Sequence, residues 1–243
     1  MASGTRKGRL FVVATPIGNL GDMTHRGVEV LRAASVIATE DTRHTRKLLS
    51  HYGIGTPLLS YHEHNEERAS AAVLARLERG EDVALVTDAG TPLLADPGYR
   101  VVSLCAREGF EVLPVPGPTA LAAALSVSGL PPMPFYFGGF LPRKPGARAR
   151  KLGEVRDLPC TLVFYEAPHR IGAALAAMLE VFGDRPAAVA RELTKIHEEV
   201  LRGPLSALAA AAAASEWRGE IVVVVGGAGD EPPRRTPDPG PRG

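Results

Sequence analysis

The sequence predicts an α/β protein made of two α/β domains, the first built on a parallel, doubly wound sheet. Its first half contains five short apolar runs, and a helical pattern follows each of the first four. The links between them are short, and polar or charged residues stand where several runs end. Repeated strand and helix units with short right-handed crossovers build a parallel sheet covered by helices.

The first half is expected to alternate strands and helices. Its apolar runs are short and rich in aliphatic residues, as buried parallel strands are. Asp22 and Asn65 are expected helix caps, and glycines stop several of the helices. The expected strands cover residues 10–14, 36–39, 58–61, 83–86 and 110–115, and the expected helices cover residues 22–32, 42–52, 65–79 and 99–108.

The pattern changes near Gly117, where we place a domain boundary and expect a mixed sheet to follow. The last residues are too rich in proline and glycine to bury a core. The expected strands here cover residues 135–140, 161–165, 187–193, 198–201 and 219–225, and the expected helices cover residues 119–128, 169–182, 204–215 and the middle of 143–156. The expected divisions are a flexible N-terminus at 1–8, domains at 9–117 and 118–226, and a disordered tail at 227–243.

Composition bounds the class of protein. Hydrophobic residues make up 45% and charged residues 23% of the 243 residues, with a formal net charge of +1, so any nucleic acid must be held by local patches. Cys105 and Cys160 are two cysteines without a disulfide framework, which favours a reducing compartment. No apolar run reaches the roughly 18 residues of a membrane span. We therefore expect a cytoplasmic protein with no membrane contact.

The segment 83–98, VALVTDAGTPLLADPG, joins a buried strand to a helix through an unusual loop. Asp88 stands where the strand should end, which is the edge where open α/β sheets bind ligands. Small residues let a ligand lie against backbone, and the loop matches neither the phosphate-cradling nor the dinucleotide glycine pattern. From the residues alone, a ligand site and a tight turn with Asp88 as helix cap are equally supported.

Two other groups have alternative readings. His62, Glu63 and His64 resemble part of a metal site, but no third and fourth ligand has convincing spacing, so we expect no metal. The same cluster could instead line the substrate side of a binding site. Tyr61, Phe135 and Tyr136 could stack on an unpaired base, although aromatics inside strands are more often core.

Eight motifs, in order along residues 9–225, resemble those of one family. They are ATPIGNLGD at 14–22, ATEDTRHTRKLL at 38–49, SYHEHNE at 60–66, TDAGTPLLADPG at 87–98, PVPGPTALAAALSVSGLP at 114–131, FLPRK at 140–144, FYEAPHR at 164–170 and RELTKIHEE at 191–199. On these residues the chain resembles the RsmI family, 16S ribosomal RNA cytidine 2′-O-methyltransferases of the tetrapyrrole-methylase-like superfamily.

The resemblance implies a homodimer that binds S-adenosylmethionine in a cleft between two α/β domains. Its implied acceptor is a cytidine ribose of 16S rRNA in the decoding centre of the 30S subunit. The implied cofactor-binding residues are Pro16, Asp88, Ala89, Gly90, Thr91, Pro92, Thr119, Ala120, Tyr165, Glu166 and Arg191. Pro16 could instead only shape its turn, Thr119 could only cap a helix, and Glu166 and Arg191 could form an ion pair with each other.

The resemblance also implies which basic residues contact RNA phosphates. Without it, these residues would be read as the solvated faces of helices. They are Arg43, Arg46, Arg143 and Lys144, whereas Arg148, Arg150 and Lys151 are candidates from charge alone. The ribose oxygen would attack the sulfonium methyl in line, and a base is needed. The base is not assigned by the sequence, and its candidates are His62, Glu66 and Lys144.

Two rival functions remain at this point. One is C-methylation of a tetrapyrrole by an enzyme of the same superfamily, and the other is a non-catalytic ribosome-binding relative. The family blocks around residues 40–49 and 165–170 argue against the first, and the intact loop at 88–92 argues against the second. Family members often continue into a small C-terminal helical domain that helps bind RNA. This chain ends in a Pro/Arg-rich tail, a departure from the family pattern that leaves the route of RNA docking open and the methyltransferase core unaffected.

Overall fold

The computed structural model describes residues 6–230, which divide into two compact units between Ala120 and Leu121. We call them unit 1 and unit 2. The predicted flexible N-terminus and tail lie outside the described residues at 1–5 and 231–243. The parts of these two predicted segments that the structure describes, residues 6–8 and 227–230, are bonded to the domains. The Gly8 N–H donates to the Leu77 carbonyl at 2.7 Å, and the Ala228 N–H donates to the Leu158 carbonyl at 2.9 Å.

Unit 1 contains the predicted five-stranded parallel sheet, in the order β3-β2-β4-β1-β5. The strands are short, and all residues of 36–39 and 83–85 are buried, as their aliphatic sequences require. Their bounds are β1 Arg9–Val13, β2 Val36–Thr39, β3 Leu58–Ser60, β4 Val83–Leu85 and β5 Glu111–Val115. The strand β4 is central, with β1 on one side and β2 on the other.

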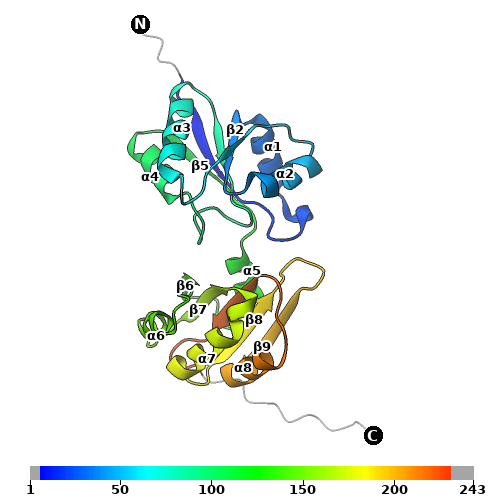
Figure 1. The fold of residues 1–243 in the computed structure, drawn as a ribbon, viewed down its shortest axis with the longest axis vertical. Helices are drawn as coiled ribbons and strands as arrows, with labels where there is room; N and C mark the ends of the chain where they lie inside the picture. Colours follow the sequence, from blue (N-terminus) through cyan, green and yellow to red (C-terminus); the bar gives the residue numbers. More distant parts are fainter. Residues whose placement is uncertain (1–5, 231–243) are drawn as a thin grey trace. The chain divides into compact units, whose positions relative to one another are not determined.

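Two helices cover each face of this sheet (Figure 1). They are α1 His25–Ala33 and α2 Thr42–His51 on one face, and α3 Glu66–Glu78 and α4 Tyr99–Arg107 on the other. Side chains alternate across each strand, so Leu10 packs with the α3 and α4 core while Val13 packs with the α1 and α2 core. This is the doubly wound arrangement that the sequence predicts.

One predicted helix cap, Asp22, is wrong, and a second, Asn65, stands at the N-cap position without capping through its side chain. Asp22 ends a short 3-10 helix, Leu20–Asp22, and α1 is capped by Thr24, whose Oγ1 accepts from the Gly27 N–H at 3.0 Å. Asn65 precedes α3 but its Oδ1 accepts from the His62 N–H at 2.8 Å, so it closes the preceding turn. The Asn65 side chain thus bonds to the turn before the helix, a choice that sequence spacing does not distinguish.

Unit 2 holds the predicted mixed sheet, in the order β6-β7-β10-β8-β9. Only β6 and β7 run parallel, and the other pairs are antiparallel. The bounds are β6 Phe135–Phe140, β7 Thr161–Glu166, β8 Pro186–Arg191, β9 Glu199–Pro204 and β10 Ile221–Val225. Residues 192–193 therefore lie beyond β8, which ends two residues earlier than predicted.

The helices of unit 2 are α5 Ala120–Val127, α6 Pro145–Gly153, α7 Ile171–Phe182 and α8 Leu205–Ala214, with a 3-10 turn at Pro168–Arg170. Side chains of α6, α7 and α8 share one core with alternate residues of β7, β8 and β10. Phe164 of β7 and Val223 of β10 are completely buried in it. The core fixes the carboxyl ends of β7 and β8, where predicted site residues lie.

Candidate functional site

The loop after β4 occupies the point of unit 1 where ligand binding is favoured. Connections from β1 and β2 pass over the α1 and α2 face, whereas the connection from β4 passes over the α3 and α4 face. Adjacent strands whose connections leave on opposite faces leave a crevice outside their carboxyl ends. Residues 86–98 follow β4 at this point, so the predicted segment stands at the switch point of the sheet.

Backbone bonds and threonine hydroxyls fix the first half of this loop. The Thr15 N–H donates to the Gly90 carbonyl at 2.8 Å, and the Gly90 N–H donates back at 3.1 Å. Thr15 Oγ1 donates to the Thr87 carbonyl at 3.1 Å, and Thr91 Oγ1 donates to the Pro118 carbonyl at 3.1 Å. The loop after β4 is thereby joined to the segments that follow β1 and β5.

These bonds bring together several of the predicted cofactor residues. Gly90 has a φ of +83°, and a Cβ there would lie 3.4 Å from Ile17 Cγ2 and 4.0 Å from the Cα of Thr119. Pro16 is buried next to the Thr15–Gly90 bridge. The turn with Pro16, the segment 88–92 and Thr119 therefore meet at one edge of unit 1, where the positive φ of residue 90 favours glycine.

The second half of the loop holds two non-glycine residues in the left-handed region, Leu93 with φ 73° and Ala95 with φ 70°. Such conformations cost energy and persist where the surroundings impose them. The loop ends at Gly98, whose N–H donates to Glu66 Oε1 at 3.2 Å, and Tyr61 OH donates to the same oxygen at 3.4 Å. Glu66, a candidate base, thus anchors the loop.

Carboxylates gather at the same edge. Asp88 is half-buried, and its Oδ1 accepts from the Asp41 N–H at 3.2 Å. Burial raises the pKa of Glu40, and the nearby carboxylates of Asp88, Asp96 and Glu63 raise it further, while His62 opposes them. A carboxyl with a perturbed pKa is a common feature of functional sites.

Glu40 was not among the predicted site residues. The signal that could have identified it was its position directly after β2, one residue before the α2 cap Asp41. Asp41 pairs with Arg43 at 3.4 Å, whereas the pKa of Glu40 is raised by burial and by the charges of other carboxylates. The sequence shows both acids but not that Glu40 is the one whose pKa is raised.

The three candidate bases lie in different surroundings. His62 is half-buried in unit 1, and its Nδ1 is buried with no hydrogen-bond partner among residues 6–230. Glu66 is committed to the Gly98 N–H. Lys144 belongs to unit 2, where it is exposed directly before α6.

In unit 2, β7 ends in Tyr165 and Glu166. The Leu121 N–H, one residue after Ala120 in the first turn of α5, donates to Tyr165 OH at 3.1 Å, and the Tyr165 ring packs on Phe137 with centroids 4.9 Å apart. Glu166 is 1% exposed and pairs with Arg170, the two groups approaching to 3.1 Å. The turn after β7 is thus built around a buried ion pair.

The predicted alternative of an ion pair between Glu166 and Arg191 is wrong. Arg191 Nε donates to Glu199 Oε2 at 2.6 Å, and its guanidinium lies 5.5 Å from the centre of the Trp217 ring. Glu199 is the register partner of Arg191 across β8 and β9. Each residue of the proposed pair therefore has a different partner.

The predicted phosphate-binding cations are exposed. Arg43 and Arg46 lie on the outer face of α2, and Arg143 and Lys144 directly precede α6. Of the three aromatics considered for base stacking, Tyr61 is 1% exposed with its hydroxyl bonded to Glu66 and Ser70. The stacking reading of Tyr61 is wrong, and Phe135 at 39% exposed stays accessible.

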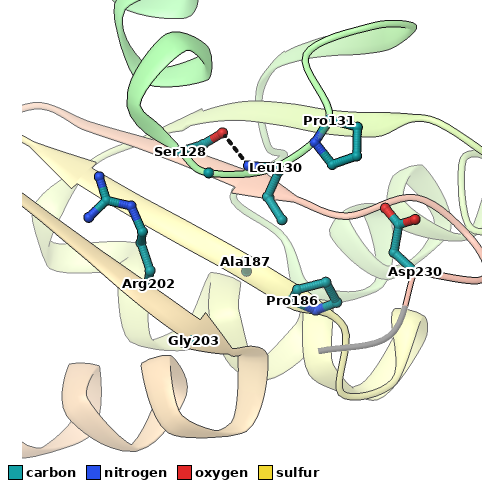
Figure 2. A pocket seen from close by; sticks show the side chains of 9 residues that line it. Ser128, Leu130, Pro131, Pro186, Ala187, Arg202, Gly203 and Asp230 are labelled. Carbon is teal, nitrogen blue, oxygen red and sulfur yellow. Dashed lines mark hydrogen bonds between the residues drawn. The ribbon is translucent and has the colours of Figure 1, made fainter. Parts of the chain in front are cut away.

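A pocket of about 320 Å³ lies in unit 2 beside the amino end of β8, at Pro186 and Ala187 (Figure 2). Leu130, Pro131 and Pro186 form apolar walls, with Arg202 at one side and Asp230 at the other. The Arg202 guanidinium already donates to the Val127 carbonyl, at 3.1 Å from Nε. None of the predicted site residues lines this pocket.

Two further findings concern residues 6–230 only. No group of three or more His, Cys, Asp or Glu side chains there has an arrangement that could hold a metal ion. No helix in the same part of the chain combines the length and apolar character needed to cross a bilayer.

Comparison with known proteins defines the class. Residues 9–209 match the family described as Tetrapyrrole (Corrin/Porphyrin) Methylases. A cobalt precorrin-4 methyltransferase structure superposes with a TM-score of 0.69 at 21% identity, covering 90% of this chain and 94% of that chain. A uroporphyrin-III C-methyltransferase from Thermus thermophilus, complexed with S-adenyl homocysteine, gives a TM-score of 0.65 at 21% identity over 90% of this chain and 97% of that one. The chain thus has the two-domain fold of a methyltransferase.

Curated relatives define the family within this class. A ribosomal RNA small subunit methyltransferase I from Xylella fastidiosa is 52% identical over 92% of this chain and 83% of its own length. Its counterpart from Pseudomonas aeruginosa is 51% identical over 90% of this chain and 79% of its own length. The chain belongs to the ribosomal RNA small subunit methyltransferase I family, as the sequence motifs indicate.

Proposed function

We propose that this protein transfers a methyl group from S-adenosylmethionine to the 2′-hydroxyl of a cytidine in 16S rRNA. The main support for this acceptor is sequence similarity: about half of the aligned residues are identical to those of methyltransferases named for small-subunit ribosomal RNA. We also propose the 30S subunit as the substrate particle, its decoding centre as the target region, a homodimer as the active form and the cytoplasm as the place of action.

The position of the loop at residues 86–98 supports S-adenosylmethionine as the methyl donor. It lies at the switch point of a parallel sheet, where nucleotides and related cofactors bind in open α/β proteins. One protein of similar fold was crystallised with S-adenyl homocysteine, the demethylated form of that donor. When bound, S-adenosylmethionine supplies a methyl group carried on a positively charged sulfonium sulfur.

The residues at this edge fit such a ligand. Asp88 and Glu40 place carboxylates near one another, and these favour a cationic group over a phosphate. Gly90 has no side chain, so the backbone of 89–92 is available to a ligand. We propose that Pro16, Ala89, Thr91, Pro92 and the start of α5 at Thr119 and Ala120 complete the unit 1 contribution.

Unit 2 is proposed to supply Tyr165, Glu166 and Arg191 to the opposite wall of the cofactor cleft. Because Glu166 is buried and paired with Arg170, its proposed part is to hold the backbone of the turn after β7. Tyr165 is half-buried and Arg191 keeps a partly exposed side chain, so these two can contact the cofactor directly.

We propose that the reaction is an in-line attack by the ribose oxygen on the methyl group, favoured by alignment and by exclusion of water. The attacking hydroxyl must lose its proton. His62 is the strongest of the three candidates because its Nδ1 has no partner among the described residues. Glu66 already anchors the loop, and Lys144 would have to act from unit 2.

Arg43, Arg46, Arg143 and Lys144 are proposed to bind phosphates of the RNA. All four are exposed, so each could neutralise a phosphate without breaking an internal structure. The rival function, C-methylation of a tetrapyrrole, is suggested by structural neighbours of about 21% identity, which establish the fold and not the substrate.

The function is tested with labelled S-adenosylmethionine and 30S subunits from a strain that lacks this activity, followed by mapping of the methylated nucleotide. Label on a 2′-oxygen of 16S rRNA supports the proposal. Transfer to a tetrapyrrole, or none, contradicts it.

The cofactor residues are tested by calorimetry on an Asp88→Ala variant. Its affinity for S-adenosylmethionine is expected to fall at least about tenfold, the scale of a lost charge-assisted contact. Asp157→Ala removes a carboxylate that is 82% exposed in unit 2 and should bind like the wild type. Wild-type affinity in Asp88→Ala would refute the assignment.

A further inference from the structure

A buried arginine on helix α6 lacks a partner among the residues that the structure describes. Arg148 is 8% exposed, and its Nε is buried with no hydrogen-bond acceptor in residues 6–230. Other buried or half-buried arginines are paired: Arg170 with Glu166, and Arg191 with Glu199. Nε is the one atom of this guanidinium that is both buried and without an acceptor, and Arg148 is in none of the ion pairs formed among residues 6–230.

An unpaired buried guanidinium is costly. Arginine cannot release its proton at any physiological pH, so burial does not turn it into a neutral group. Removing an ion from water without a compensating charge costs several kcal/mol in general. The position therefore favours a ligand that brings an anionic acceptor to Arg148.

The surroundings of Arg148 also favour an anion. It is the fourth residue of α6, and helical side chains lean toward the N-terminus of their helix, so we expect its guanidinium near the first turn. That turn has no side-chain cap, which leaves N–H groups of residues 146 and 147 without a capping acceptor. Uncapped N–H groups and the helix dipole attract negative charge.

The local charge has one sign. The α6 segment, residues 143–153, contains five cations and no Asp or Glu. Arg143, Lys144 and Arg150 are exposed, and Lys151 lies over the Tyr136 ring at 6.0 Å. No carboxylate of this segment can therefore satisfy Arg148.

We propose that Arg148 and the first turn of α6 form a phosphate-binding subsite that receives a backbone phosphodiester of the RNA substrate. That the phosphate belongs to RNA rests on the proposed function, whereas the affinity of the subsite for a phosphate oxyanion rests on Arg148 itself. We call the first part of the proposal the RNA source. Arg148 offers a planar fork of donors that grips two phosphate oxygens. Exposed Arg143 and Lys144 act as point charges beside it.

The phosphate affinity is tested by thermal unfolding in a phosphate-free buffer and with added inorganic phosphate at constant ionic strength. Phosphate is expected to raise the Tm of the wild type and of Arg150→Met, the exposed control two residues along. It should leave Arg148→Met unchanged. Equal responses in all three proteins would overturn the subsite, and so would an equal response to chloride.

Stability without phosphate separates this subsite from a structural role. Arg148→Met removes an unpaired buried charge, so its Tm without phosphate should be no lower than that of the wild type. Arg148→Lys should keep part of the phosphate response because it keeps the charge but loses the fork. A large loss of stability in both variants would show an internal partner and overturn the proposal.

The RNA source is tested by fluorescence anisotropy of a labelled oligoribonucleotide at several salt concentrations. Arg148→Met should weaken binding roughly tenfold and reduce the slope of log K against log salt by about 0.7, the value for one phosphate of a single strand. If Arg148→Met bound RNA as tightly as the wild type while still losing the phosphate response of its Tm, the subsite would bind phosphate but not the RNA backbone, and the RNA source would be overturned. Because neither assay requires methyl transfer, a failure of the proposed enzyme activity would be seen separately.

Discussion

The loops that carry many of the predicted site residues are held by different kinds of bond in the two units. The loop after β4 in unit 1 is fixed by backbone bonds between Thr15 and Gly90 and by two threonine hydroxyls. The turns after β7 and β8 in unit 2 are fixed by charged side chains. The loop after β4 therefore relies mainly on backbone and hydroxyl bonds, with one carboxylate anchor at Glu66, whereas the turns of unit 2 add ion pairs to their backbone bonds.

Among the turns of unit 2, the loop after β8 shows the contribution of ion pairs most clearly. Glu192 has a φ of 50° and Thr194 a φ of 67°, so its backbone is as unusual as that of the first loop. Lys195 Nζ lies 2.8 Å from Glu192 Oε1 and 3.3 Å from Glu220 Oε2. Non-glycine residues thus adopt the left-handed region in both loops, and in the loop after β8 they lie beside a network of ion pairs.

The largest effect is expected where a buried charge loses its partner. Glu166→Ala leaves Arg170 unpaired at 16% exposure and should lower the free energy of unfolding by about 3–5 kcal/mol, measured by urea titration. Glu199→Ala breaks the more exposed pair with Arg191 and should cost about 1 kcal/mol or less. Similar losses in both variants would contradict a special role for the buried pair.

A smaller effect is expected from backbone conformation in unit 1. Gly90→Ala and Gly109→Ala place a side chain at φ values of +83° and +71°, so both should cost about 1–2 kcal/mol of stability. Gly109 has no neighbour within 4 Å of an added Cβ and stands away from the loop. Only Gly90→Ala should weaken binding of S-adenosylmethionine in calorimetry, and equal affinities would show that the loop does not contact the cofactor.

The first loop was the more predictable of the two. Apolar runs and glycine stops determine where β4 ends, and the order of a doubly wound sheet then places Asp88 at its binding edge. The partner of Thr15 was not predictable, because an isolated bridge joins segments that are 75 residues apart. Backbone hydrogen bonds of this kind do not depend on which side chains are present, so the sequence pattern does not indicate them.

The charged turns of unit 2 could be predicted as site positions but not as pairs. Arg170 follows Glu166 by four residues, which suits an ion pair only if the turn between them folds back. Arg191 meets Glu199 because β8 and β9 align these residues in register. A cation near two acids in sequence gives several pairings, and only the sheet register selects one.

The smallest effects concern pH, and the two regions should respond with opposite signs. The pKa of Glu192 is lowered, chiefly by its bond to Lys195, so its stabilisation is complete above its unfolded value of 4.5 and is lost as the pH falls through the folded value. The pKa of Glu40 is raised, chiefly by burial, so its charge destabilises the fold once the pH has risen above the folded value.

Glu192→Gln should therefore lower the Tm at pH 7 and have no effect in acid, whereas Glu40→Gln should raise the Tm at pH 7 and lose this gain below about pH 4.5, the unfolded value. Each change should amount to about 1 kcal/mol or less, as for other partly exposed charges. Thermal unfolding of both variants and the wild type between pH 4 and 8 measures them. If both variants shifted the Tm in the same direction at pH 7, charge would not distinguish the two loops. Opposite shifts that converge with the wild type in acid would establish that unit 1 gathers like charges at its edge while unit 2 pairs opposite ones.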